Sequence, residues 1–143
     1  HGWSDPALTA FGSIKYHDQV HARDPKAGDY LRMFMMPGVQ HCGSTGSPGP
    51  NTFSPISPLQ ALEQWVEKGI APERVLAYRP VNPYVTAPRA LEDYGATYSK
   101  LGRHPMPPGS YDRARPVFPY PAWTRYSGKG DPGDPKSWVK VER

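Results

Sequence analysis

The clearest periodic pattern of apolar positions lies between Ser57 and Gly69. Four apolar residues in this stretch recur at helical spacing and share one face: Leu59, Leu62, Trp65 and Val66. Ser57 is a favourable N-cap, Pro58 suits the first helical position, and glycine commonly ends a helix. The pattern therefore predicts an amphipathic helix that begins at Pro58 and ends at Gly69.

Two further elements are predicted nearer the start of the chain. Irregularly spaced apolar residues predict a helix over residues 7–23, which Asp5 would cap as the chain enters Pro6. A nearly continuous apolar run over residues 30–36 predicts a short strand covered on both faces. If another strand ends at His1, the three segments form a strand–helix–strand unit whose strands are parallel.

The second half of the chain carries weaker patterns. Residues 74–78 predict a strand, and residues 137–141 predict a short final edge strand. Six prolines fall within residues 79–113, so this stretch is predicted to be mostly irregular.

Composition limits the class of protein. Leu, Ile, Val and Phe together number 23 of 143 residues, about 16%, and a chain below roughly 20% struggles to build its own core. No run of about 18 apolar residues exists, which excludes a membrane-spanning helix. The net charge of +4 is too small to argue for disorder through charge repulsion.

An aspartate and a histidine follow the two predicted parallel strands. Asp5 comes just after His1, and His41 comes shortly after residues 30–36. Neighbouring strands lie about 4.8 Å apart. Catalytic residues of open α/β sheets gather where such strands end. Asp followed by His is also the chain order of the last two members of a Ser–Asp–His hydrolase triad.

Four short motifs lie in order along most of the chain. They are HGWSDP at residues 1–6, RMFMMPG at 32–38 running into His41-Cys42, WVEKG at 65–69 with Ala71-Pro72, and RPVFPYP at 115–121 with Tyr126, Gly128, Gly130 and Asp131. Each motif alone is weak. As a set they are specific, and they resemble the C-terminal part of the tannase/feruloyl esterase family of α/β-hydrolases.

This resemblance implies a carboxylic ester hydrolase that acts on esters of aromatic acids by a serine-hydrolase mechanism, with no cofactor. It implies that Asp5 is the triad acid, that His41 is the general base, and that Cys42 forms a disulfide with a missing N-terminal segment. The resemblance also implies that this segment supplies the serine; this chain itself has no Gly-x-Ser-x-Gly motif. Residues 1–78 would be the C-terminal part of the α/β-hydrolase core, a βαβ unit plus a helix, and residues 79–143 a Pro-rich irregular tail packed on it.

Two departures from the family pattern concern cysteines. Phe118 and approximately Lys140 stand where family members usually carry a pair of cysteines, so one structural disulfide is absent. The resemblance still implies a secreted or periplasmic protein, although this loss weakens the inference.

Simpler interpretations remain open for each residue. Asp5 could be only an N-cap, His41 an exposed loop histidine, and Cys42 a buried thiol. The chain as a whole could be a non-catalytic remnant or binding module, because its low aliphatic content would leave apolar surface for a partner.

Two other patterns suggest different chemistry. His17 and His21 flank Asp18 at a spacing that can bind zinc, but no third ligand follows, and we predict a solvated helix face. Cations also alternate with aromatics in a set that could bind single-stranded nucleic acid: Arg113, Arg115, Tyr120, Trp123, Arg125, Tyr126 and Lys129. No nucleic-acid fold motif accompanies this set, so such binding is not expected.

Overall fold

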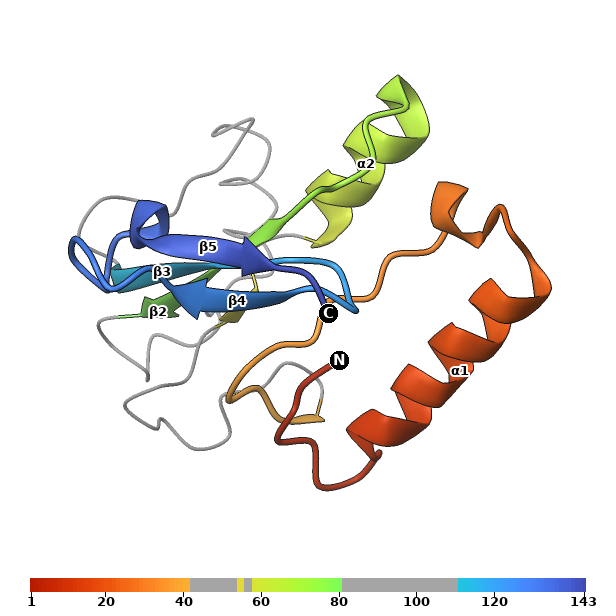
Figure 1. Ribbon diagram of the computed structural model, residues 1–143, viewed down its shortest axis with the longest axis horizontal. Helices are drawn as coiled ribbons and strands as arrows, with labels where there is room; N and C mark the ends of the chain where they lie inside the picture. Colours follow the sequence, from red (N-terminus) through yellow and green to blue (C-terminus); the bar gives the residue numbers. More distant parts are fainter. Residues whose placement is uncertain (42–53, 56–57, 81–110) are drawn as a thin grey trace, which may run out of the picture.

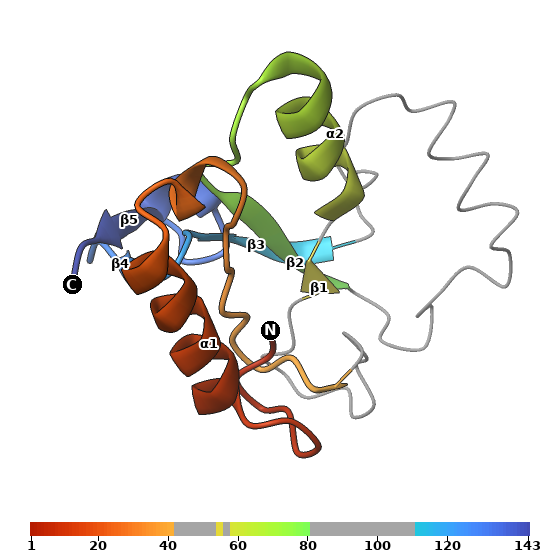
Figure 2. The same ribbon diagram turned by 90° about the vertical axis from the view of Figure 1, so that its right-hand side faces the viewer.

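The computed structural model describes residues 1–41, 54–55, 58–80 and 111–143. In chain order the elements are α1 (Ala10–Arg23), η1 (Ala27–Asp29), β1 (Ser54–Pro55), α2 (Pro58–Lys68), β2 (Val75–Pro80), β3 (Tyr111–Val117), β4 (Trp123–Tyr126), η3 (Pro135–Ser137) and β5 (Trp138–Val141). The two α-helices stand apart, and residues 31–41 run between α1 and the strands (Figures 1 and 2). The chain is thus a mixed helix-and-strand structure.

The first residues of the chain pair in parallel with a segment beyond α1. Gly2 forms a parallel bridge with Met36. The Met36 amide donates to the His1 carbonyl at 2.8 Å, and the Trp3 amide donates to the Met36 carbonyl at 3.0 Å. The Ser4 amide donates to the Val39 carbonyl at 3.1 Å and continues the pairing. The predicted parallel neighbours are therefore present, with α1 as the connection between them.

A continuous strand over residues 30–36 is a wrong prediction. Only Phe34 and Met36 form bridges, and both bridges are isolated. The start of the run is held in a turn instead, because the Leu31 amide donates to the Ala27 carbonyl at 2.8 Å. Tyr30 is also 59% exposed, so the apolar run is not covered along its whole length.

Helix α1 begins at Ala10, three residues later than predicted. Its N-cap is Thr9, whose side chain makes no capping bond. Asp5 Oδ1 instead accepts hydrogen bonds from the amides of Ala7, at 2.8 Å, and Leu8, at 2.9 Å. Asp5 therefore closes a turn that precedes the helix, and its predicted role as the cap of α1 is wrong.

Helix α2 confirms the clearest sequence pattern. It starts at Pro58 and ends at Lys68, with Gly69 in the left-handed conformation at φ 67°. The Gly69 amide donates to the Trp65 carbonyl at 3.0 Å. A glycine adopts this conformation without steric cost, which explains why the helix stops there. The predicted cap, Ser57, lies outside the described residues.

The core lies between the His41-bearing segment and an antiparallel sheet. Strand β2, which confirms the strand predicted at 74–78, pairs with β1 and β3. Phe34 and Val75 pack against a cluster of four buried residues: Met36, Val39, Ala77 and Val117. This cluster fixes the segment that leads to His41 against the sheet.

The segment predicted to be an irregular tail, residues 79–143, contains regular strands. Strands β3 and β4 occupy residues 111–117 and 123–126, and β5 confirms the predicted final strand. Pro116 is compatible with a strand here because β3 is at the edge of the described sheet, where a missing amide is tolerated. Strand β2 also continues past residue 78, where we placed the boundary between core and tail. Residues 81–110 lie outside the described part of the chain.

Candidate active site

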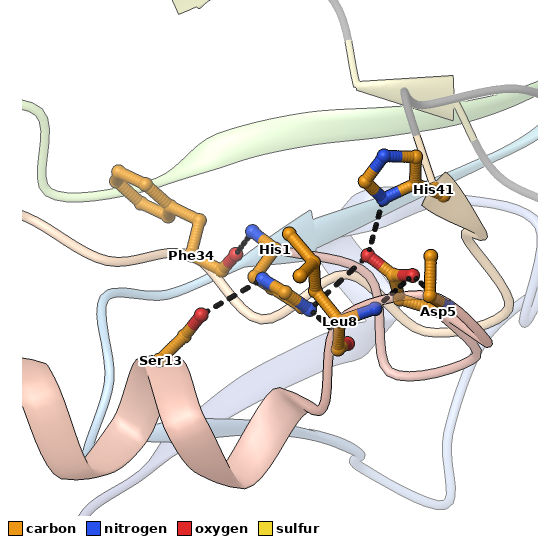
Figure 3. Close-up of polar contacts among 7 residues, drawn as sticks. His1, Asp5, Leu8, Ser13, Phe34 and His41 are labelled. Atoms are coloured by element: carbon orange, nitrogen blue, oxygen red, sulfur yellow. Dashed lines mark hydrogen bonds and ion pairs between the residues drawn. The ribbon is translucent and has the colours of Figure 1, made fainter.

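Asp5 and His41 are in contact at the end of the parallel pairing. Asp5 follows the paired residues 1–4, and His41 follows the Met36–Val39 segment that lies beside them. His41 Nδ1 lies 2.9 Å from Asp5 Oδ2 (Figure 3). The backbone pairing thus brings together two side chains that are 36 residues apart in sequence.

The carboxylate of Asp5 is buried and well supplied with donors. Its side chain is only 5% exposed. Oδ1 accepts the two backbone amides of Ala7 and Leu8, and Oδ2 accepts from His41. The hydrogen bond from the Leu8 amide, followed by that from His41, lowers the pKa of Asp5 below its ordinary value. Asp5 is therefore held as a carboxylate near neutral pH.

The imidazole of His41 has one edge bonded and one edge open. An ionised carboxylate only accepts hydrogen bonds, so Nδ1 carries the hydrogen that points at Asp5. In the neutral ring, Nε2 is then an unprotonated acceptor. The side chain is 45% exposed, which leaves this nitrogen accessible to an incoming group.

A second histidine contacts the same carboxylate. His1 Nε2 lies 3.4 Å from Asp5 Oδ2 and 3.2 Å from the Leu8 carbonyl oxygen, and its Nδ1 lies 2.9 Å from Ser13 Oγ. Sequence reasoning assigned no role to His1 or Ser13. The spacing of four residues between His1 and Asp5 was a signal, but it indicates contact only once the intervening turn is known.

The lowered pKa of Asp5 predicts a pH-dependent contribution to stability. A carboxyl group whose folded pKa is below the ordinary value of 3.8 stabilises the fold fully above that value, and loses this contribution as the pH falls through the folded pKa. We expect the difference in unfolding free energy between the unaltered chain and Asp5→Asn to be largest at pH 6 and to shrink towards pH 3. Denaturant unfolding at several pH values measures it. A difference that stays constant, or grows on acidification, would contradict the assignment.

The other predicted site residues are placed differently. Cys42 lies outside the described residues. His17 is 6% exposed and packs edge-on against Tyr120, at 5.3 Å between ring centroids, so a solvated helix face is wrong for this residue. Its ring lies 4.2 Å from that of His21. Within the described ranges, no group of three His, Cys, Asp or Glu side chains is placed to hold a metal ion.

The basic and aromatic residues of the tail are partly used in packing. The Arg115 guanidinium lies 4.1 Å from the centre of the Trp138 ring, and Tyr126 contacts the same ring edge-on. Burial lowers the pKa of Arg115. Trp123, by contrast, is 61% exposed. These contacts hold β3 against β4 and β5, which gives Arg115 and Tyr126 a structural role.

The part of the chain that the structure describes contains no helix long and apolar enough to cross a membrane.

Comparison with known sequences identifies related esterases. The family model for tannase and feruloyl esterase matches residues 1–141. Mono(2-hydroxyethyl) terephthalate hydrolase of Piscinibacter sakaiensis is 33% identical over 92% of this chain. A probable feruloyl esterase of Arthroderma benhamiae is 41% identical over 54% of it. The chain spans only 17% and 14% of the lengths of these two relatives.

Two solved structures share the arrangement of the chain. Feruloyl esterase B from Aspergillus oryzae superimposes with a TM-score of 0.62 and 26% identity, and an esterase from the same organism with a TM-score of 0.67 and 23% identity. Each comparison covers 99% of this chain and 26% of the solved one. Because the family model covers nearly the whole sequence, the chain belongs to the tannase and feruloyl esterase family.

Proposed function

We propose that this chain is the C-terminal part of an α/β-hydrolase that cleaves carboxylic esters of aromatic acids, with Asp5 as the triad acid and His41 as the general base. The observation that carries the proposal is the 2.9 Å contact between His41 Nδ1 and Asp5 Oδ2. Membership of the family supports ester hydrolysis. The names of two relatives, a terephthalate ester hydrolase and a feruloyl esterase, support an aromatic acid in the substrate.

The geometry suits the proton transfers of a serine esterase. His41 Nε2 takes the hydroxyl proton of the serine while the serine oxygen forms a bond to the ester carbonyl carbon. The same proton then passes to the leaving alcohol as the carbon–oxygen bond of the ester breaks. Water repeats the cycle on the acyl-enzyme and releases the acid. Asp5 keeps Nδ1 protonated and stabilises the imidazolium that forms in each step.

The proposal places the serine in a segment that precedes residue 1 in the complete hydrolase. The chain spans about a fifth of its relatives, which leaves room for such a segment. Apolar side chains also stand exposed on both helices, among them Phe11 at 73%, Leu62 at 52% and Val66 at 76%. We assign the preceding segment as the partner that covers these side chains.

Cys42 provides a covalent link in this proposal. Its position directly after His41 would let a disulfide to the preceding segment hold the base beside the nucleophile. Such a bond persists in an oxidising compartment, so the proposal includes a periplasmic or secreted location.

The test is to isolate the protein from its source with an antibody to this segment and to measure its intact mass with and without reductant. We expect a mass well above the 15.9 kDa of this chain, from a continuous polypeptide or from a disulfide-linked partner. We also expect a serine-directed fluorophosphonate to label a residue outside this chain. A 15.9 kDa protein that is unchanged by reductant and is not labelled would contradict the proposal.

A further inference from the structure

We propose that His1 is a positioning residue for the triad acid: its imidazole, oriented by hydrogen bonds to Leu8 and Ser13, lies against the Asp5 carboxylate and holds it towards His41. The inference deepens the proposed function and rests on the roles given there to Asp5 and His41. Within the described residues, the recorded polar contacts of the His1 nitrogens are with Asp5, Leu8, Ser13 and Phe34. The effect of His1 is exerted through the orientation of the Asp5 carboxylate.

The neighbours of His1 fix which of its nitrogens carries hydrogen. Nε2 lies 3.2 Å from the Leu8 carbonyl oxygen and 3.4 Å from Asp5 Oδ2, and both of these atoms only accept hydrogen bonds. Nε2 must therefore be protonated. In the neutral ring Nδ1 is then the acceptor, and it receives the hydroxyl hydrogen of Ser13 at 2.9 Å.

The imidazole of His1 is held from three directions. Its backbone nitrogen donates to the Phe34 carbonyl at 2.9 Å, which fixes the residue in the parallel pairing. The ring then lies between the turn that contains Asp5 and the first turns of α1, where Ser13 is located (Figure 3). The side chain is only 15% exposed, so water competes weakly for these contacts.

The contacts around Asp5 leave its carboxylate little freedom to rotate. Oδ1 is fixed by the amides of Ala7 and Leu8. Oδ2 lies between two imidazoles, with His41 Nδ1 at 2.9 Å and His1 Nε2 at 3.4 Å. Without the His1 imidazole, Oδ2 loses its neighbour at 3.4 Å on the buried side. The carboxylate can then turn about its Oδ1 bonds, and the bond to the more exposed His41 loses its fixed direction.

The experiment compares four variants of the complete hydrolase: His1→Leu, His1→Gln, Ser13→Ala and Ser127→Ala. Leucine keeps apolar bulk without a donor, whereas glutamine restores an N–H near the Leu8 carbonyl and Oδ2. The hydroxyl group of Ser127 bonds to the nearby backbone of Lys129 in a surface turn, and its alanine variant is the matched serine control. We expect His1→Leu to lower kcat roughly 10- to 100-fold with little change in KM, because a small misplacement of catalytic groups lowers the reaction rate by about this factor. We expect a smaller loss in Ser13→Ala, substantial recovery in His1→Gln, and no loss in the control.

A second readout separates positioning from a merely structural role. The His41 Nδ1 proton shared with Asp5 should give a far-downfield proton resonance, assigned by its disappearance in His41→Ala. We expect this signal to broaden or vanish in His1→Leu and to return in His1→Gln. Equal losses of kcat and of melting temperature in His1→Leu and His1→Gln, with the resonance intact in both, would overturn the positioning role.

The outcome for His1 is distinguishable from failure of the proposed function. If His41→Ala retains full activity, the triad assignment itself fails. If His41→Ala is inactive while His1→Leu keeps both the normal kcat and the downfield resonance, only the inference about His1 is overturned.

Discussion

Replacing His41 with alanine is expected to lower kcat for ester hydrolysis by the complete enzyme about 10⁶-fold, as loss of the general base does in serine hydrolases. The side chain is 45% exposed, and its single hydrogen bond in the described structure is to Asp5. Its removal leaves no large cavity, so the fold should survive. The loss would therefore report on proton transfer and not on unfolding.

Asp5→Asn is expected to cost about 10⁴-fold in kcat, less than loss of the base. The amides of Ala7 and Leu8 require an acceptor at the position of Oδ1, so the asparagine oxygen must face them. Its NH₂ group then faces His41 and requires Nδ1 to accept. The single hydrogen of the neutral His41 ring is then on Nε2, and this nitrogen can no longer accept a proton from the serine.

Steady-state assays with a chromogenic ester of an aromatic acid measure both losses, and two variants on α1 provide matched controls. His21→Ala changes a histidine in the last turn of the helix, and Asp18→Asn changes an aspartate whose side chain is 55% exposed. Both should retain near-normal kcat. Full activity in His41→Ala, or an equal loss in the controls, would remove the basis for the catalytic assignment.

Gly2→Ala is expected to lower the unfolding free energy by about 3 kcal/mol, at the upper end of the usual cost of overpacking. A Cβ at Gly2 would lie 2.1 Å from the Val39 carbonyl oxygen and 2.7 Å from the Val39 carbonyl carbon. Both are backbone atoms, so no side-chain rotation relieves the clash. Relief requires the two paired segments to separate, and this movement would also carry His41 away from Asp5.

Gly12→Ala is the matched control, since it adds the same methyl group within α1. Its Cβ would approach only the Cγ2 atom of Thr9, at 3.2 Å, which is the end of a side chain. The helix-forming tendency of alanine should raise stability by up to about 1 kcal/mol. Denaturant unfolding of the chain measures both variants. Similar stabilities for the two variants would show that the backbones of residues 2 and 39 are not closely packed in solution.

Local patterns in the sequence were sufficient for several elements but not for others. Helix α2 was predictable because apolar spacing, Pro58 and Gly69 all indicate the same boundaries. The run at 30–36 was misleading because only Met35 and Met36 are buried and Phe34 is partly buried, while backbone bonds at its start close a turn. Strand β3 was missed because proline argues against a strand unless its edge position is known.

The candidate site was predictable only in part. The contact of Asp5 with His41 follows from parallel segments joined by a helix, which is a topological argument that sequence supports. The contact of His1 with Ser13 depends on where α1 begins. That boundary is set by the turn at Asp5, which the sequence alone suggested was a helix cap.

The parallel pairing has a consequence for how the chain tolerates changes in length. The separation of acid and base is set by backbone hydrogen bonds from residues 1–4 to Met36 and Val39, and not by the connection that loops out between them. Residues added to or lost from the exposed turn after α1, near Lys26, would leave this registration intact. Related proteins can therefore vary in spacing between the two residues while retaining the same hydrogen bond, so a fixed sequence interval is a poor criterion for finding the pair.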